Sequence, residues 1–301
     1  LKVAFVPSRD PEAIVTATEP LKELLKQELA KEGYDVKNVD ITVGTSFDAV
    51  GEALASGSAD VGFLPGGTYV LYDKEVDVLL TATRDNLLKD SSNPKDWNDG
   101  LETKRGTEQA TSYKGLIIAG PTEKGKELAA KINSGQELTW DDLNSAKWGV
   151  LGTSSSSGYI YPGAMLVKAG INLDKDISYQ FSGGHDKSLQ LLLNKDVDVI
   201  ATFDGVEERY AKDFPAALTD IEKLASSDTI PGIMVTASSK MDKDLQEKLK
   251  QALLDMDKDP KMKELFTKMF SITGFEEVDQ TAYNKVEETA KVMNVDLDKV
   301  K

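Results

Sequence analysis

The chain has 301 residues, enough for about two domains, and its 40% hydrophobic content is typical of a soluble globular protein without a membrane span. Its formal charge of −15, from 36 basic and 51 acidic residues, argues against nucleic acid and anionic lipid as partners. The lack of cysteine excludes disulfides and thiolate chemistry, and the single histidine excludes a histidine-rich metal site, so we expect no metal and no cofactor.

Strand and helix signals alternate over the first 82 residues. Short apolar runs predict strands, and apolar stripes at helical spacing predict the helices between them. The predicted strands are 2–6, 40–43, 60–64 and 76–82, and the predicted helices are 12–29 and 47–54. This repeated order predicts a parallel sheet covered by helices.

Residues 84–112 interrupt this alternation. The run is polar, carries several charges and contains Asn93-Pro94 and Asn98-Asp99-Gly100. We therefore predict a long surface excursion, and loops of such length are usually functional or mobile.

The alternation resumes in a second set that ends near residue 215. Its predicted strands are 114–119, 148–151, 177–181 and 197–202, its predicted helices are 123–133, 158–169 and 185–193, and residues 218–224 and 232–237 are strand-like. The remainder is predicted to be helical, with apolar stripes that include Leu245, Leu249, Leu253, Met256, Leu265, Met269, Tyr283, Val286, Ala290 and Met293.

Two such sets predict an α/β protein with two lobes. Lobe 1 would comprise residues 1–112 and 238–301, and lobe 2 would comprise residues 113–237. Two strands, near residues 113–119 and 228–238, would cross between the lobes. A small-molecule site between the lobes is the usual placement in such a protein.

The most informative segment is a serine-rich turn between a strand and a helix, within residues 151–163. Serine hydroxyls, the unpaired N–H groups of a first helical turn and the helix dipole together suit a bound anion. No lysine or arginine occurs from Leu151 to Val167, so we expect neutral donors and short-range hydrogen bonds. The alternative is a polar turn that only caps its own helix.

Enzyme motifs are absent from this turn. No Gly-Lys-Ser/Thr follows, as a phosphate-binding P-loop would require, and no Gly-x-Ser-x-Gly nucleophile elbow is present. A serine hydrolase built from Ser157, His185 and Asp204 remains a minor alternative. We expect no enzymatic activity.

The serine turn resembles the signature of phosphonate-, phosphite- and phosphate-type periplasmic binding proteins of ABC transporters. That signature is Ser-(Ser/Thr)-Ser-Gly-(Tyr/Phe)-x-x-Pro, and here it is the run from Ser155 to Pro162. Further family-like pieces follow the same order along the chain, in residues 46–54, 59–66, 112–118, 183–186, 198–204 and 230–231. The resemblance implies a type II periplasmic-binding-protein fold, in which each lobe is a mostly parallel sheet flanked by helices.

The resemblance also implies ligand-binding roles. Ser155, Ser156 and Ser157 match the oxyanion loop, and His185 matches a ligand histidine whose protonation a nearby anion would favour. Tyr113 matches an aromatic residue whose hydroxyl faces the ligand. Without the resemblance, His185 would be assigned to the surface or a cap, and Tyr113 equally well to the core.

Two acidic residues and one aromatic residue are weaker candidates. Asp204 matches an acidic position that would accept a P–OH proton or an ammonium group of the ligand, or else it caps the helix that begins near Gly205. Asp228, just before Ile230-Pro231, is a further acidic candidate. Phe47 stands where many relatives have tyrosine, which leaves the ligand's substituent open.

The resemblance implies an extracytoplasmic receptor that captures a phosphorus oxyanion between closing lobes and delivers it to an ABC permease. It implies a monomer, at the cell surface or in the periplasm, that is tethered as a lipoprotein through a removed N-terminal anchor. The alternative is a two-lobed receptor for another solute, such as a thiamine-precursor pyrimidine or a carboxylate.

Overall fold

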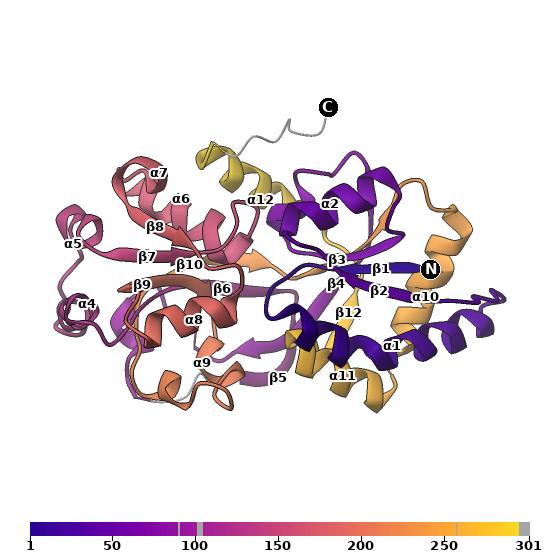
Figure 1. Cartoon of the computed structure of the whole chain (residues 1–301), viewed down its shortest axis with the longest axis horizontal. Coiled ribbons are helices and arrows are strands. Elements are labelled where there is room, and N and C mark those ends of the chain that lie inside the picture. Colours follow the sequence, from indigo (N-terminus) through magenta and orange to yellow (C-terminus); the bar gives the residue numbers. More distant parts are fainter. Residues whose placement is uncertain (90, 101–104, 257, 295–301) are drawn as a thin grey trace.

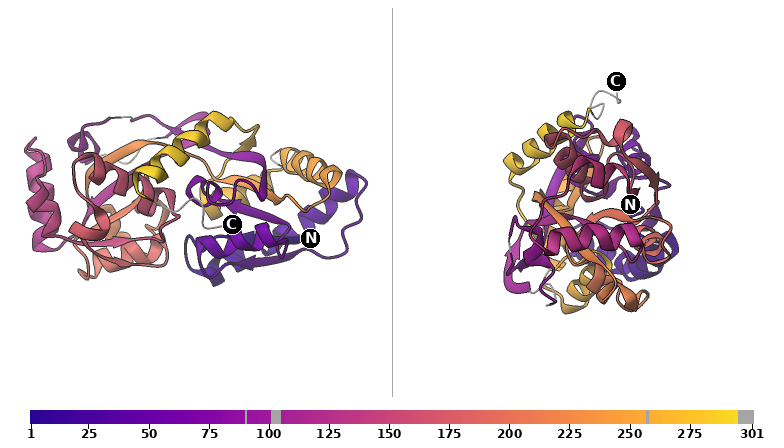
Figure 2. Two further views of the ribbon diagram at one scale, coloured as in Figure 1. Left: turned by 90° about the horizontal axis from the view of Figure 1, so that it is seen from above. Right: turned by 90° about the vertical axis from the view of Figure 1, so that its left-hand side faces the viewer.

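The computed structural model describes residues 1–89, 91–100, 105–256 and 258–294, and Figure 1 shows two α/β halves joined in the middle. We call the first sheet with its helices lobe 1 and the second sheet with its helices lobe 2. Seen from above in Figure 2, the lobes lie side by side along the long axis. Residues 90 and 101–104 of the predicted excursion and the side chain of Met269 lie outside the described residues.

Lobe 1 is built on a sheet of order β12-β4-β11-β3-β1-β2, with β5 paired to β4. Alternate residues of β1 face opposite sides, so that Val3 and Phe5 pack under α1, α10 and α11, while Ala4 packs under α2. The elements are β1 (Lys2–Phe5), α1 (Pro11–Lys31), β2 (Asp40–Val43), α2 (Phe47–Ser56), β3 (Val61–Leu64), α3 (Gly66–Tyr69), β4 (Val76–Leu87), β5 (Arg105–Ala110), β11 (Met234–Ser238), α10 (Lys243–Met256), α11 (Pro260–Phe270) and β12 (Gly274–Glu276).

Lobe 2 is built on a sheet of order β10-β6-β9-β7-β8. Trp148 and Ile117 face the helices α4 and α6, and Leu116 and Ile200 face α8 and α9. The elements are β6 (Ser112–Ala119), α4 (Glu123–Asn133), α5 (Trp140–Asn144), β7 (Lys147–Val150), α6 (Tyr161–Lys168), α7 (Leu173–Asp176), β8 (Ser178–Phe181), α8 (His185–Leu193), β9 (Val199–Phe203), α9 (Val206–Arg209) and β10 (Glu222–Pro231).

Both sheets are mixed, which corrects the prediction that each is mostly parallel. The parallel part of lobe 1 is β2-β1-β3, and that of lobe 2 is β8-β7-β9. The strands that pass between the lobes enter the sheets in the opposite direction: β11 is antiparallel to β3 and β4, and β6 is antiparallel to β9 and β10. The sequence pattern reveals strands but not the direction in which a returning strand runs.

Two crossing connections join the lobes, as predicted. One runs from β5 into β6 and the other from β10 into β11, and a hydrogen bond from the N–H of Gly232 to the carbonyl of Thr111 (2.7 Å) ties them together. The helix α12 (Gln280–Val292) lies across this junction (Figure 1). Its Tyr283 hydroxyl lies 3.0 Å from Thr81 Oγ1, while Ala290 packs within the lobe 2 core. The residue boundaries of the lobes therefore stay a prediction.

The predicted excursion at 84–112 is more ordered than its polarity indicates. The strand β4 continues to Leu87, and β5 pairs with it as a hairpin arm. The indole of Trp97 is buried and donates to the carbonyl of Ser91 (2.9 Å). Asn98 bonds both backbone groups of Lys223 in β10, at 2.7 and 2.8 Å. This segment thus packs on lobe 2 instead of projecting from the surface.

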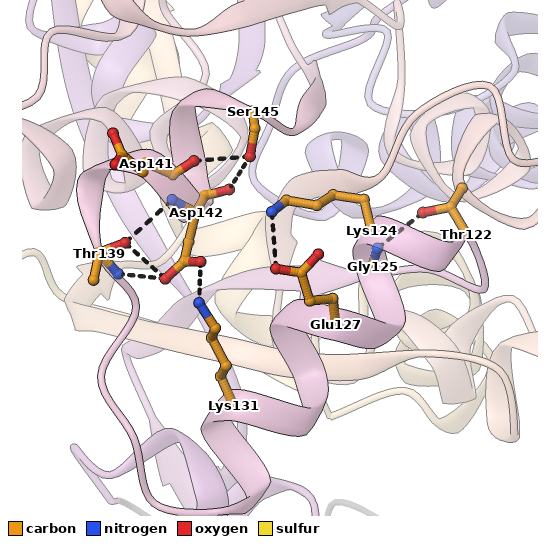
Figure 3. Close-up of polar contacts among 9 residues, drawn as sticks. All are labelled: Thr122, Lys124, Gly125, Glu127, Lys131, Thr139, Asp141, Asp142 and Ser145. Atoms are coloured by element: carbon orange, nitrogen blue, oxygen red, sulfur yellow. Dashed lines mark hydrogen bonds and ion pairs between the residues drawn. The ribbon is translucent and has the colours of Figure 1, made fainter.

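Local capping decides where several helices begin and end. Ser46 accepts from the N–H of Ala49, and Gly57, with φ of 77°, ends α2 in the left-handed region that favours glycine. Thr139 and Asp142 form a reciprocal capping box at α5, and Lys131 of α4 forms an ion pair with the same carboxylate (Figure 3). Although burial opposes the change, the bonds from Lys131 and Thr139 lower the pKa of Asp142 to about 2.

Candidate functional site

A small cavity of about 70 Å³ lies between the lobes. That is several times what one buried water requires, so a ligand of a few heavy atoms fits. Lobe 1 and the β10–β11 connection contribute Val6, Ser8, Phe47, Pro65, Arg84, Ile233, Phe270 and Ser271. Lobe 2 contributes Tyr113, Ser155, Ser156, Ser157, His185, Phe203, Arg209 and Tyr210.

The serine turn forms one wall of the cavity. A single π-helical turn, Ser156–Ile160, follows Ser155 and leads into α6. The Ser155 hydroxyl accepts from the N–H of Gly158 at 3.2 Å and thus caps the turn, and the same residue lines the cavity. The Ser156 hydroxyl accepts from the N–H of Gly67 in lobe 1 at 2.8 Å. One of the three serines therefore connects the lobes as well as lining the cavity.

His185 begins α8 and is buried beside the cavity. Its Nδ1 lies 2.9 Å from Thr202 Oγ1, and its ring packs edge-on against Phe203. Burial, with the nearby positive charge of Arg209, lowers the pKa of His185 to about 3. The imidazole of the protein by itself is thus neutral at physiological pH, and only a bound anion would favour protonation.

Tyr113 and Arg84 meet at the cavity through a cation–π contact. Arg84 Cζ lies 4.4 Å from the centroid of the Tyr113 ring. Burial raises the pKa of Tyr113, although the Arg84 guanidinium and the Ser157 hydroxyl oppose that rise. The tyrosine is therefore protonated at neutral pH and able to donate a hydrogen bond.

Asp204 is buried, but it is not part of the cavity lining. Its carboxylate accepts from Arg105 Nη2 and from the N–H of Lys114, both at 2.8 Å. It does not cap α9 either, because Gly205 is the N-cap residue and receives no side-chain bond. The structure thus places Asp204 outside the cavity lining, as a link between the β4–β5 hairpin and lobe 2, and its role toward a ligand stays a prediction.

Of the two other candidates, Phe47 lines the cavity and Asp228 does not. Phe47 lines the cavity as the first residue of α2, where it supplies an apolar surface. Asp228 lies away from the cavity, because its side chain is 83% exposed and faces Lys168 Nζ at 3.4 Å.

Two arginines of the lining were missed by sequence reasoning. Arg84 lies in β4, within the stretch assigned to a surface excursion, and Arg209 ends the short helix α9. Both arginines line the cavity, so cationic side chains stand there beside the neutral donors that the serine turn predicts. A signal was available, because Arg9, Arg84, Arg105 and Arg209 are the only arginines among 36 basic residues.

Hydrogen bonds link the lobes around the cavity. The N–H of His185 donates to the carbonyl of Ser8 (3.0 Å), and Arg209 Nη1 donates to Ser271 Oγ (2.8 Å). Together with the bond between Gly67 and Ser156, these contacts describe a closed arrangement of the lobes.

Within residues 1–89, 91–100, 105–256 and 258–294, acidic, cysteine and histidine side chains form no group able to hold a metal ion. Over the same residues, no helix combines the length and apolar character needed to cross a bilayer.

The model of one protein family matches residues 3–283. That family is described as the phosphonate-binding periplasmic substrate-binding protein of ABC transporters. The chain belongs to this family. It is therefore a phosphonate-type substrate-binding protein of an ABC transporter, and this confirms the resemblance carried by the serine turn. The family comprises transport receptors, not enzymes, which removes the serine hydrolase alternative.

Solved structures with the same fold support the architecture of this binding protein. PhnD1 from Prochlorococcus marinus, in complex with methylphosphonate, matches with a TM-score of 0.72 and 18% identity over 98% of each chain. A component of an ABC phosphonate transporter from Pseudomonas aeruginosa matches with a TM-score of 0.73 and 14% identity, over 100% of this chain and 89% of the other. A Xanthomonas citri protein bound to ATP matches with a TM-score of 0.69 and 17% identity, over 100% and 99%. At these identities the likeness establishes the fold alone.

Proposed function

We propose that this binding protein captures a small phosphorus oxyanion, a phosphonate, phosphite or phosphate, between its lobes and delivers it to an ABC permease. In this proposal Ser155, Ser156 and Ser157 donate to the ligand oxygens, together with Tyr113 and His185. The observation that carries it is the convergence of these polar side chains with Arg84 and Arg209 on one small cavity.

The chemistry of the lining supports a tetrahedral oxyanion. Hydroxyl groups adapt their hydrogen positions to several acceptor oxygens, and guanidinium groups supply charge-assisted bonds. The lining includes no carboxylate among the residues that the structure describes, so a negatively charged ligand meets no direct repulsion. This combination favours an anion over the pyrimidine considered as an alternative.

The remaining lining supports a small, uncharged substituent on phosphorus. Phe47, Phe203 and Phe270 offer apolar contact that suits a hydrogen atom or a methyl group. The carboxylate expected to receive an ammonium group, Asp204, is engaged by Arg105 and the N–H of Lys114. We therefore propose phosphite or a short alkylphosphonate ahead of an aminoalkylphosphonate.

Transport follows from lobe closure. We propose that residues 1–112 with 238–301 and residues 113–237 act as the two closing lobes, and that the closed form docks on the permease. A lipid anchor preceding Leu1, which would hold the receptor at the cell surface, is part of the same proposal.

Isothermal titration calorimetry with phosphite, phosphate, methylphosphonate and 2-aminoethylphosphonate tests the proposed function. Replacement of Ser157 or His185 by Ala should weaken oxyanion binding by about 1.5–3 kcal/mol, the scale of a hydrogen bond to a charged group. The unliganded melting temperature of Ser157→Ala should change little, whereas His185→Ala also loses the contacts with Thr202 and Phe203. Ser134→Ala, in an exposed helix cap, is the matched control. The absence of binding to every one of these oxyanions would refute the proposal.

A further inference from the structure

The arginines of this chain gather around one place. Arg84 and Arg209 line the cavity, and Arg105 bonds the buried Asp204, which also faces Arg84. Arg9 lies close enough to Arg209 for its charge, with that of Arg84 and with burial, to lower the pKa of Arg209. An acidic protein of charge −15 thus concentrates its guanidinium groups where its lobes meet.

Among these arginines, Arg84 carries a particular energetic cost, the cost of burying its charge. Its side chain is only 12% accessible to solvent, and within the described part of the chain its guanidinium makes no hydrogen bond. The nearest carboxylate oxygen belongs to Asp204, 3.9 Å from Arg84 Nη1. Charge is costly in such a poorly solvated place unless an anion lies close by, so Arg84 favours an anionic ligand in the cavity.

Asp204 does not neutralise this charge by itself. One carboxylate faces two guanidinium groups, and its short bonds go to Arg105 and the N–H of Lys114. Two arginines, Arg84 and Arg209, line the cavity, whereas no acidic residue among those that the structure describes does so. The balance of charge at the cavity therefore matches a ligand with two negative charges better than a ligand with one.

We propose that Arg84, with Arg209 as the second cation of the lining, makes the site selective for doubly charged oxyanions over singly charged ones of the same shape. The inference rests on the proposed function and specifies its ligand class: a dianion without an ammonium group. Arginine suits this role, because its planar donors can engage two oxygens of one tetrahedral group.

The protein's own groups contribute little to the pH dependence of such binding. The titratable side chains facing the cavity or packed behind it include Arg9, Arg84, Arg105, Tyr113, His185, Asp186, Asp204, Glu208, Arg209 and Tyr210. Burial raises the pKa of both tyrosines and lowers that of His185 to about 3. From about pH 6 to about pH 9 the ionisation of the ligand therefore sets the affinity.

Methylphosphonate and methanesulfonate form the decisive pair of probes. Both are tetrahedral and carry one methyl group, but the sulfonate holds a single charge at every pH tested. Calorimetry near pH 9 should give methylphosphonate an advantage of about 100-fold over methanesulfonate. Below its second ionisation, the affinity of methylphosphonate should fall about tenfold per pH unit, while that of methanesulfonate stays constant.

Arg84→Gln should reduce the advantage of methylphosphonate to less than about 10-fold, because one charge-assisted contact is lost. Arg84→Lys keeps the charge and should retain most of the affinity advantage of methylphosphonate. This variant provides the test if Arg84→Gln folds poorly. Lys168→Gln removes an equal charge from an exposed pair outside the lining and is the control.

The possible failures of the two proposals can be told apart. Three results would overturn the charge selectivity and leave the proposed function standing. They are equal affinity of the wild-type protein for both probes, an unchanged ratio of the two affinities in Arg84→Gln, and binding of methylphosphonate that strengthens toward low pH. A lack of binding to any phosphorus oxyanion would overturn both.

Discussion

A methyl group on Gly67 should prevent full closure of the lobes. In the closed arrangement, a Cβ at this position would lie 2.6 Å from the carbonyl oxygen of Ser154 and 2.5 Å from Ile160 Cδ1. Real Cβ atoms essentially never show contacts below 3.0 Å, and both contacts come from lobe 2. Gly67→Ala therefore has to push the lobes apart by several tenths of an ångström, while lobe 1 alone accommodates the methyl group.

The expected loss of affinity follows from two effects. Overpacking at a tight contact costs about 1–3 kcal/mol. The displacement also strains the 2.8 Å bond from the N–H of Gly67 to Ser156 Oγ, which contributes about 1 kcal/mol. Because ligand binding selects the closed form, Gly67→Ala should weaken binding by about 1–3 kcal/mol, or about 5- to 150-fold.

Calorimetry with the tightest-binding oxyanion measures this loss, and small-angle X-ray scattering measures ligand-induced compaction. Gly152→Ala is the matched control, because a Cβ there meets nothing within 4 Å. The unliganded melting temperature should stay near that of the wild type for both variants. Wild-type affinity and compaction in Gly67→Ala would refute the closed contact between Gly67 and the serine turn.

Two further substitutions separate structural from ligand-binding roles. Asp204→Asn should lower the free energy of unfolding of the unliganded protein by about 3–5 kcal/mol in chemical denaturation, because it breaks the ion pair of the buried Asp204 with Arg105. Asp228→Asn is the control and should change neither stability nor affinity. An unaltered denaturation midpoint in Asp204→Asn would contradict this. Thr139→Ala should cost about 1 kcal/mol through loss of the capping box at α5, and Thr139→Ser should recover most of it. Equal stability of the Ala and Ser variants would argue against the cap.

Much of the fold could be predicted because its signals are local. Apolar periodicity located the helix at Glu123–Asn133 and the strand at Asp40–Val43 with the bounds that the structure has. Capping residues and glycines marked other ends, such as Gly57 after α2. The strand β12 and the short helix α5 carried too few residues for a periodic signal and were not predicted.

The candidate site could be predicted only in part. The serine turn and His185 stand at the starts of helices, where a short motif is enough to indicate an anion site, and the structure places both at the cavity. The sequence could not reveal the partners of Asp204, because Arg105 and Lys114 lie about a hundred positions earlier in the chain. Asp228 resembled a site residue by its position near Ile230-Pro231, yet its side chain points to solvent.

The sequence by itself determined the order of strands and helices, the family and the serine turn. These features depend on neighbours within a few residues. The direction of the returning strands, the bond between Ser156 and Gly67 and the meeting of Arg84 with Arg209 were decided by the tertiary structure alone. The physical reason is that the cavity is lined from both lobes, so its charge is set by residues that only the closed fold brings together.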